Sequence, residues 1–175
     1  FQSVPSFRCS DPYFERHWWY RWYGLKLNAV AGCTAPNYPY PTVCEGIGHF
    51  HVPIAYSAPA HVRELRWLAD PEWARGVVRT FLHHQKPDGS FHGRIYADHL
   101  EGTDFYHGDW GGALEALNAS HPDPGFLAEV YPGLSRYANW LLHTRDDDLT
   151  GMCDVVDQYE TGQEYMSRYQ AVDPE

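Results

Sequence analysis

The sequence lacks several features that would each place it in a familiar class of protein. Basic residues are few, since 13 Lys and Arg stand against 23 Asp and Glu, for a formal net charge of −10. Nucleic-acid backbones are bound by clustered basic side chains, so we expect no nucleic-acid partner. No apolar run approaches the ~20 residues that cross a bilayer, so neither a membrane span nor a membrane partner is predicted.

Metal-ligand motifs are also lacking. The four cysteines show no CxxC and no zinc-type spacing. They are Cys9, Cys33, Cys44 and Cys153. Three interpretations remain open, namely unpaired or partly buried thiols, a Cys33–Cys44 disulfide or zinc ligation, and so the compartment is undetermined. His49 and His51 would suit a metal on a strand, but no third ligand is evident. We therefore expect neither a metal nor a cofactor, and localisation stays unknown because no leader pattern is recognisable.

What the sequence has in abundance is rings. It contains 7 Trp, 13 Tyr, 8 Phe and 11 His, within a hydrophobic fraction of 43% that excludes intrinsic disorder. Aromatic rings with a polar group suit both protein cores and sugar-binding clefts.

Helix signals dominate the chain. Asp-Pro pairs, in which Asp caps a helix and Pro occupies its first turn, begin predicted helices at residues 11–12, 70–71 and 123–124. Two more are predicted from about residue 58 and around 110–117, with a restart of the last helix at Pro132. The helix from Pro12 has aromatic residues on two sides, which predicts that it lies inside the molecule. Weak alternation over 90–96 predicts a short β-hairpin.

Two stretches of the chain resemble each other. Asp70-Pro71, a helix and then Asp88-Gly89 are echoed by Asp123-Pro124, a helix and then residues 148–151, at a spacing of roughly fifty to sixty residues. This predicts an all-α fold, an incomplete (α/α)6 toroid of about half a ring, with long loops. A simple helical bundle is the alternative, although bundle loops are usually short. We expect residues 1–175 to be the N-terminal part of a single domain, truncated at both ends.

Three irregular segments concentrate carboxylates, imidazoles and aromatic rings: residues 37–51, 98–110 and 154–168. Loops on a rigid scaffold are where binding and catalysis concentrate, and these three are expected to meet at one rim of the toroid. The candidate substrate-binding residues in or beside them are Glu45, His107, Asp109, Trp110, Glu160 and Arg168. Arg21 and Trp22 of the first helix are added as candidate cavity-lining residues.

The stretch from Tyr159 to Tyr169, Tyr-Glu-Thr-Gly-Gln-Glu-Tyr-Met-Ser-Arg-Tyr, resembles the acid-bearing motif of the six-hairpin glycosidases. These are the trehalases of glycoside hydrolase family 37 and the processing glucosidases and mannosylglycerate hydrolases of family 63. Five residues match that motif: Glu160, Gly162, Ser167, Arg168 and Tyr169. Glu164 stands where those enzymes have Asp as the general acid, and Glu can transfer a proton in the same way.

The resemblance implies an (α/α)6 glycosidase that cleaves an O-glycosidic bond with inversion. Glu164 would be the general acid and the base carboxylate would lie beyond Glu175, so the fragment alone is expected to be inactive. A carbohydrate is the implied partner. A weaker similarity over 40–46 implies that Glu45 contacts substrate.

Each candidate also has a plainer interpretation. Glu164 could close a capping box with Thr161 or bind substrate, and Arg168 could pair with Glu164 along a helix. Asp109 could simply cap a helix, and Glu160 could be an alternative acid or orient its neighbours. Two other functions stay open: a sugar epimerase or polysaccharide lyase with His107 as base, or a carbohydrate-binding toroid without catalysis. The sequence does not name the sugar, the anomer or the linkage.

Overall fold

The computed structural model describes residues 4–100, 108–156, 160 and 166–167. Its elements in chain order are α1 (Pro12–Asn28), β1 (Ala29–Val30), β2 (Thr42–Val43), a 3₁₀ turn η1 (Gly48–Phe50), α2 (Ala58–Leu65), α3 (Glu72–His83), α4 (Trp110–Ser120) and α5 (Pro124–Thr144). None of the helices in this part of the chain has the length and apolarity needed to cross a membrane. The prediction of an all-α fold is confirmed.

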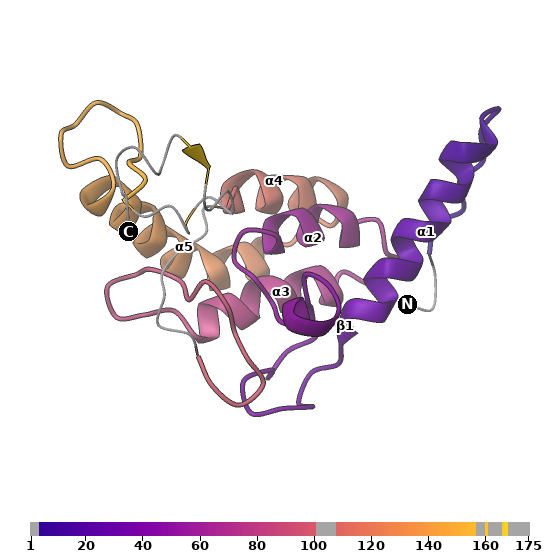
Figure 1. The fold of residues 1–175 in the computed structure, drawn as a ribbon, viewed down its shortest axis with the longest axis horizontal. Helices are drawn as coiled ribbons and strands as arrows, with labels where there is room; N and C mark the ends of the chain where they lie inside the picture. The colour runs from indigo at the N-terminus through magenta and orange to yellow at the C-terminus, as the bar shows by residue number, and fades with distance from the viewer. Residues whose placement is uncertain (1–3, 101–107, 157–159, 161–165, 168–175) are drawn as a thin grey trace.

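The helices form two successive hairpins, α2–α3 and α4–α5, that lie side by side (Figure 1). Helix α2 packs against both α3 and α4, and α3 packs against α5 and β2. Corresponding helices of the two hairpins are therefore neighbours, which is the arrangement expected of part of an α/α toroid.

Local capping explains where the helices begin. The carboxylates of Asp11, Asp109 and Asp123 accept hydrogen bonds from backbone N–H groups in the first turns of α1, α4 and α5. After α3 the chain turns at Gly89, whose φ of +98° is a conformation that favours glycine. The predicted Asp-Pro starts of α1 and α5 and the Asp-Gly stop after α3 are thus confirmed.

The core lies between the two hairpins and is centred on α3. Phe81, Phe91 and Trp110 pack around one another with ring centroids 5.2–6.0 Å apart. Val62 and Leu65 of α2 are fully buried against them in the same cluster. This cluster fixes the second hairpin against the first.

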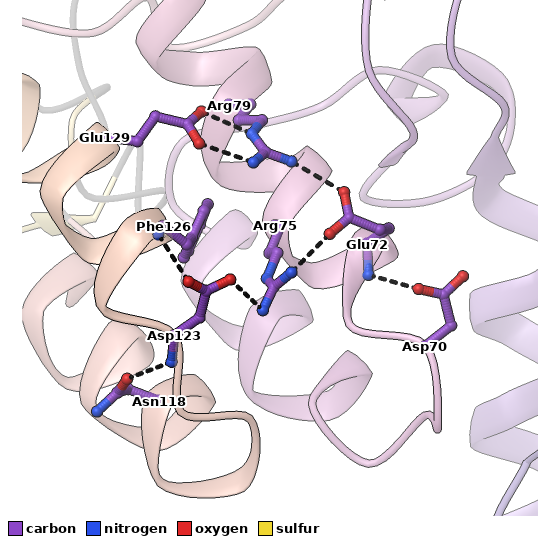
Figure 2. Close-up of polar contacts among 8 residues, drawn as sticks. All are labelled: Asp70, Glu72, Arg75, Arg79, Asn118, Asp123, Phe126 and Glu129. Carbon is purple, nitrogen blue, oxygen red and sulfur yellow. Dashed lines mark hydrogen bonds and ion pairs between the residues drawn. The ribbon is translucent and has the colours of Figure 1, made fainter.

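A layer of charged residues joins α3 to the N-terminal half of α5 (Figure 2). Arg79 makes a bidentate pair with Glu129, at 2.7 Å for both contacts, and also reaches Glu72 at 2.9 Å. Arg75 bridges Glu72 and Asp123, each at 2.8 Å. The geometry therefore holds the start of α5 in register with α3.

One prediction about α1 is wrong. The helix forms, but it projects from the remaining helices (Figure 1), and Tyr13 and Phe14 are 77% and 65% exposed. Within the described residues only Trp22 and Leu25 of this helix are buried. Aromatic residues on two sides of a helix allow it to be buried on both sides. In the described part of the chain, other residues pack against one side of α1 only.

Two smaller predictions are also wrong. Helix α5 runs through Pro132 without a restart. Pro132 and Ala128, whose carbonyl loses its helical partner, are both exposed, so water can satisfy that oxygen. Residues 90–96 contribute only isolated bridges, Ile54 to Arg94 and Ile95 to Leu100. The two-stranded antiparallel sheet of the described residues is instead formed by β1 and β2.

Candidate functional site

A buried ion pair closes the C-terminal end of α5. Arg145, the residue that follows the helix, donates from Nη2 to Oε1 of Glu160 at 2.7 Å and from Nη1 to Oε2 at 3.0 Å. The two side chains are only 6% and 7% exposed. A bidentate guanidinium–carboxylate pair is planar and directional, so it fixes the orientation of Glu160 as well as its position.

Glu160 has a third contact. The backbone N–H of Val156 donates to Oε2 at 3.2 Å, so both carboxylate oxygens accept hydrogen bonds. Both oxygens are thus engaged by groups of the protein, and the Glu160 side chain is only 7% exposed. This geometry suits the orienting interpretation of Glu160 and opposes its role as an alternative acid.

A stack of rings leads from the core to this ion pair. Phe91 stacks on Tyr137 with centroids 4.6 Å apart, and Tyr137 stacks on Trp140 at 6.1 Å. The Arg145 guanidinium lies 5.4 Å from the Trp140 ring centroid, within the range of a cation–π contact. The end of α5 is thereby tied to the centre of the fold.

Tyr137 also connects the stack to the segment before α4. Burial raises the pKa of Tyr137 to about 12, and the nearby backbone of Gly108 partly offsets that effect. Asp109 and Trp110 follow directly. The structure thus brings the predicted residues Asp109 and Trp110 into the same assembly as Glu160.

Asp109 has a structural role in addition to its predicted binding role. Its carboxylate caps α4 by accepting from Gly112 N at 2.8 Å, and it forms an ion pair with Arg63 of α2. The Gly112 N–H and, after it, the Arg63 guanidinium hold the pKa of Asp109 below its usual range. The carboxylate is thus ionised at neutral pH and remains largely exposed, so it can accept hydrogen bonds from hydroxyl groups.

Trp110 is a core residue, only 3% exposed. Its neighbours nevertheless line a groove of about 490 Å³ between α4 and α5, whose walls are mostly apolar. The groove is lined by Asp109, Trp110, Leu114, Tyr131, Leu134 and Leu141, among others. A ligand in this groove could therefore contact only the small exposed part of the Trp110 side chain.

Arg21 and Trp22 belong to α1, and this helix lies at the opposite side of the molecule from α5 (Figure 1). Arg21 forms a bidentate pair with Glu64 of α2, with contacts of 2.7 and 2.8 Å from Nη2. Both residues line a pocket of about 400 Å³ between α1 and α2, together with Trp18 and Trp67. The structure does not bring this pocket together with Glu160.

Glu45 lies in a tightly closed loop after β2. The backbone of Glu45 bonds to Val52 at 3.0 Å and that of Gly46 bonds to Phe50 at 2.9 Å, which pins both sides of the loop. Glu45 is half-buried. Within the described residues no hydrogen bond or ion pair engages its carboxylate, and none joins it to the other candidates.

Three predicted site residues, His107, Glu164 and Arg168, lie outside the described residues. Two residues that the sequence analysis missed, Arg145 and Tyr137, organise the site. The sequence signal for Arg145 was weak, because a lone Arg before an acidic run at a helix end is common. Its partner Glu160 lies fifteen residues away with no periodic relation to it.

The four cysteines and the pair His49 and His51 all lie within the described residues. All four cysteines are free, and Cys44 is buried while Cys33 is exposed. Burial raises the pKa of Cys44 to about 12. His51 Nδ1 contacts the Gly46 carbonyl oxygen and His49 lies 3.5 Å from Arg94. Three exposed carboxylates, of Asp147, Asp148 and Asp154, have oxygens within 4.8 Å of one another, a proximity common at surfaces without an ion.

Comparison with known proteins adds the family. Residues 53–175, well over half of the chain, match the model of the mannosylglycerate hydrolase MGH1-like glycoside hydrolase domain. The searches of curated proteins and of solved structures each gave no match. The matched region contains the assembly around Arg145 and Glu160 and the motif from which the resemblance to six-hairpin glycosidases was stated. The chain belongs to the MGH1-like glycoside hydrolase domain family.

Proposed function

We propose that this protein hydrolyses an O-glycosidic bond with inversion, with Glu164 as the general acid and a base carboxylate downstream of Glu175. The family is one of glycoside hydrolases, so the activity class is that of a glycosidase and the substrate is a carbohydrate. In an inverting reaction the acid protonates the leaving oxygen as the glycosidic C–O bond breaks. Water adds to the opposite face of the anomeric carbon and gives its proton to the base.

The observation that carries the choice of acid is the engagement of Glu160. Its oxygens accept hydrogen bonds from Arg145 and Val156 and its side chain is only 7% exposed, which disfavours Glu160 as the group that delivers a proton to the substrate. The acid-bearing motif contains one other carboxyl group, that of Glu164. A general acid must hold a proton and deliver it, and Glu164 is the residue that the motif leaves for this task.

The remaining candidates are proposed to hold the sugar. Asp109 is ionised and exposed beside a groove, which suits it to accept hydrogen bonds from hydroxyl groups. The half-buried Glu45 carboxylate is without a partner among the described residues and is proposed to do the same. Glu160 is proposed to orient the acid-bearing motif. Binding roles are also proposed for Arg21, Trp22, His107, Trp110 and Arg168.

The test uses the full-length protein and a panel of natural α- and β-linked disaccharides. Glu164→Gln should retain less than a tenth of wild-type activity on the best substrate. Glu115→Gln is the matched control, because Glu115 is an exposed carboxylate on α4, and it should keep full activity. On the glycosyl fluoride of the same sugar, whose leaving group needs no proton, Glu164→Gln should stay active. Activity above a tenth on the disaccharide would remove Glu164 as the acid.

Product analysis in the same assay separates the alternatives. A free reducing sugar supports hydrolysis. An unsaturated ring would identify a lyase, an isomerised sugar would identify an epimerase, and saturable binding without turnover would identify a carbohydrate-binding module.

A further inference from the structure

We propose that Arg145 is a positioning residue for the reaction, which fixes the acid-bearing motif to the end of α5 by clamping Glu160. This inference rests on the proposed function, because the motif matters to catalysis only if Glu164 is the acid. Arg145 lies outside the motif itself.

The first support is the geometry of the clamp. The guanidinium meets the carboxylate with two parallel hydrogen bonds, at 2.7 and 3.0 Å, and both side chains are nearly excluded from solvent. A fork-to-fork pair resists rotation about either side chain, which a single-point contact does not. Glu160 stands four residues before Glu164 in the sequence, so fixing Glu160 limits how far Glu164 can lie from the end of α5.

The second support is that the loop between the two partners is fastened to both of them. The backbone N–H of Asp154 donates to the carbonyl oxygen of Arg145, and the backbone N–H of Val156 donates to Glu160. Within the loop, Asp146 accepts from Gly151 N at 3.0 Å. Residues 145–156 and Glu160 are therefore held together by these hydrogen bonds and by the ion pair.

The third support is the connection to the core. The Arg145 guanidinium packs on the ring of Trp140, and Tyr137 and Phe91 continue the stack of rings towards the core. Because Arg145 is packed against the core, it can hold Glu160 in one position, whereas an arginine on a surface loop could not. Lysine would keep the charge of Arg145 but lose the fork and the flat face that stacks on Trp140.

The test compares Arg145→Lys with wild type on the best disaccharide and on the glycosyl fluoride of the same sugar. A displaced acid fails only where a proton is needed, so kcat on the disaccharide should fall about 10- to 100-fold with little change in KM. Activity on the fluoride should stay near wild type. The alkaline limb of the pH–rate profile on the disaccharide, which reports the acid, should also move. Arg136→Lys is the matched control, since Arg136 is exposed on the same helix and contacts Gln85.

A double-mutant cycle supplies a second test. If Arg145 and Glu160 act as one unit, Arg145→Lys combined with Glu160→Gln should be no slower than the slower single variant. Equal losses on disaccharide and fluoride, or unchanged kinetics for Arg145→Lys, would overturn the positioning role. Activity of Glu164→Gln above a tenth of wild type on the disaccharide would instead overturn the proposed function. A Glu164→Gln variant below that limit, beside a normal Arg145→Lys, would refute the positioning role alone.

Discussion

Gly76 of α3 makes possible a close approach between α3 and the segment before β2, and alanine there should disrupt it. A Cβ built on Gly76 would overlap the carbonyl oxygen of Pro41 and come within 3.1 Å of the Pro41 carbonyl carbon. Both partners are backbone, one in a helix and one next to β2, so neither can turn aside as a flexible side chain would. Pro41 lies just before β2, and β2 leads to the loop that carries Glu45.

The magnitude follows from two opposing effects. Alanine is favoured over glycine inside a helix by about 1 kcal/mol. Overpacking a filled contact costs typically about 1–3 kcal/mol. Gly24, inside α1, has no atom within 4 Å of its built Cβ, so Gly24→Ala shows the helix preference alone. The difference between the two variants cancels that preference and isolates the overpacking cost of about 1–3 kcal/mol.

Urea unfolding followed by tryptophan fluorescence measures both variants. We expect Gly24→Ala to raise the unfolding midpoint and Gly76→Ala to lower it, with unchanged m-values. If Glu45 contacts substrate, Gly76→Ala should also raise KM, because its loop is displaced. A Gly76→Ala protein that is as stable as Gly24→Ala would refute the reasoning, since the contact with Pro41 would then have no energetic consequence.

Four further predictions follow from the same structure. Burial and, after it, the nearby Arg21 lower the pKa of His61 to about 4, so the native state stays unprotonated between pH 6.5 and 4 while the unfolded chain takes up a proton. The contribution of His61 to the free energy of unfolding is therefore fully present above about pH 6.5, and about 3 kcal/mol of it is lost between pH 6.5 and pH 4. In urea titrations, His61→Leu should make the free energy of unfolding depend less on pH in this range, and an unchanged pH dependence would refute the prediction. Arg79→Met should destabilise the fold by about 1 kcal/mol at pH 7, because the pairs are partly exposed. The hydrogen bond with Arg79 is the chief cause of a lowered pKa of Glu129, so the pair contributes its full stability above about pH 4.5 and loses it as acid protonates the carboxylate. If the stability difference between Arg79→Met and wild type were as large at pH 3 as at pH 7, the prediction would be contradicted. Cys44 should resist iodoacetamide in the native protein while Cys33 reacts, as peptide mass mapping can show, and rapid native labelling of Cys44 would oppose its burial. In proton NMR of the first turnovers, the released sugar should have the anomeric configuration opposite to that of the substrate; retention would exclude the inverting reaction.

Local chemistry carried the prediction of the elements. Asp11 and Asp123 cap their helices through interactions within three residues, and Gly89 adopts its positive φ for reasons contained in one turn. Such features depend on neighbours in the chain, so the sequence shows them directly. The restart at Pro132 failed because the cost of an internal proline depends on whether water reaches the freed carbonyl, which is a tertiary property.

The candidate site was predicted in part for the same reason. Asp109 and Glu160 were found because acids in loops beside aromatic residues stand out in a sequence. Whether Glu160 donates a proton or orients its neighbours depends on which cation meets it. That cation, Arg145, is fifteen residues away, and Arg21 likewise meets Glu64 across forty-three.

The sequence by itself determined the helical class, the helix starts and the motif that resembles the six-hairpin glycosidases, because each depends on residues that are close together in the chain. Tertiary structure alone decided that α1 is exposed, that Trp110 belongs to the core and that Arg145 clamps Glu160. Burial and ion pairing depend on what lies across the molecule, and residues far apart in the chain become neighbours only when the hairpins pack.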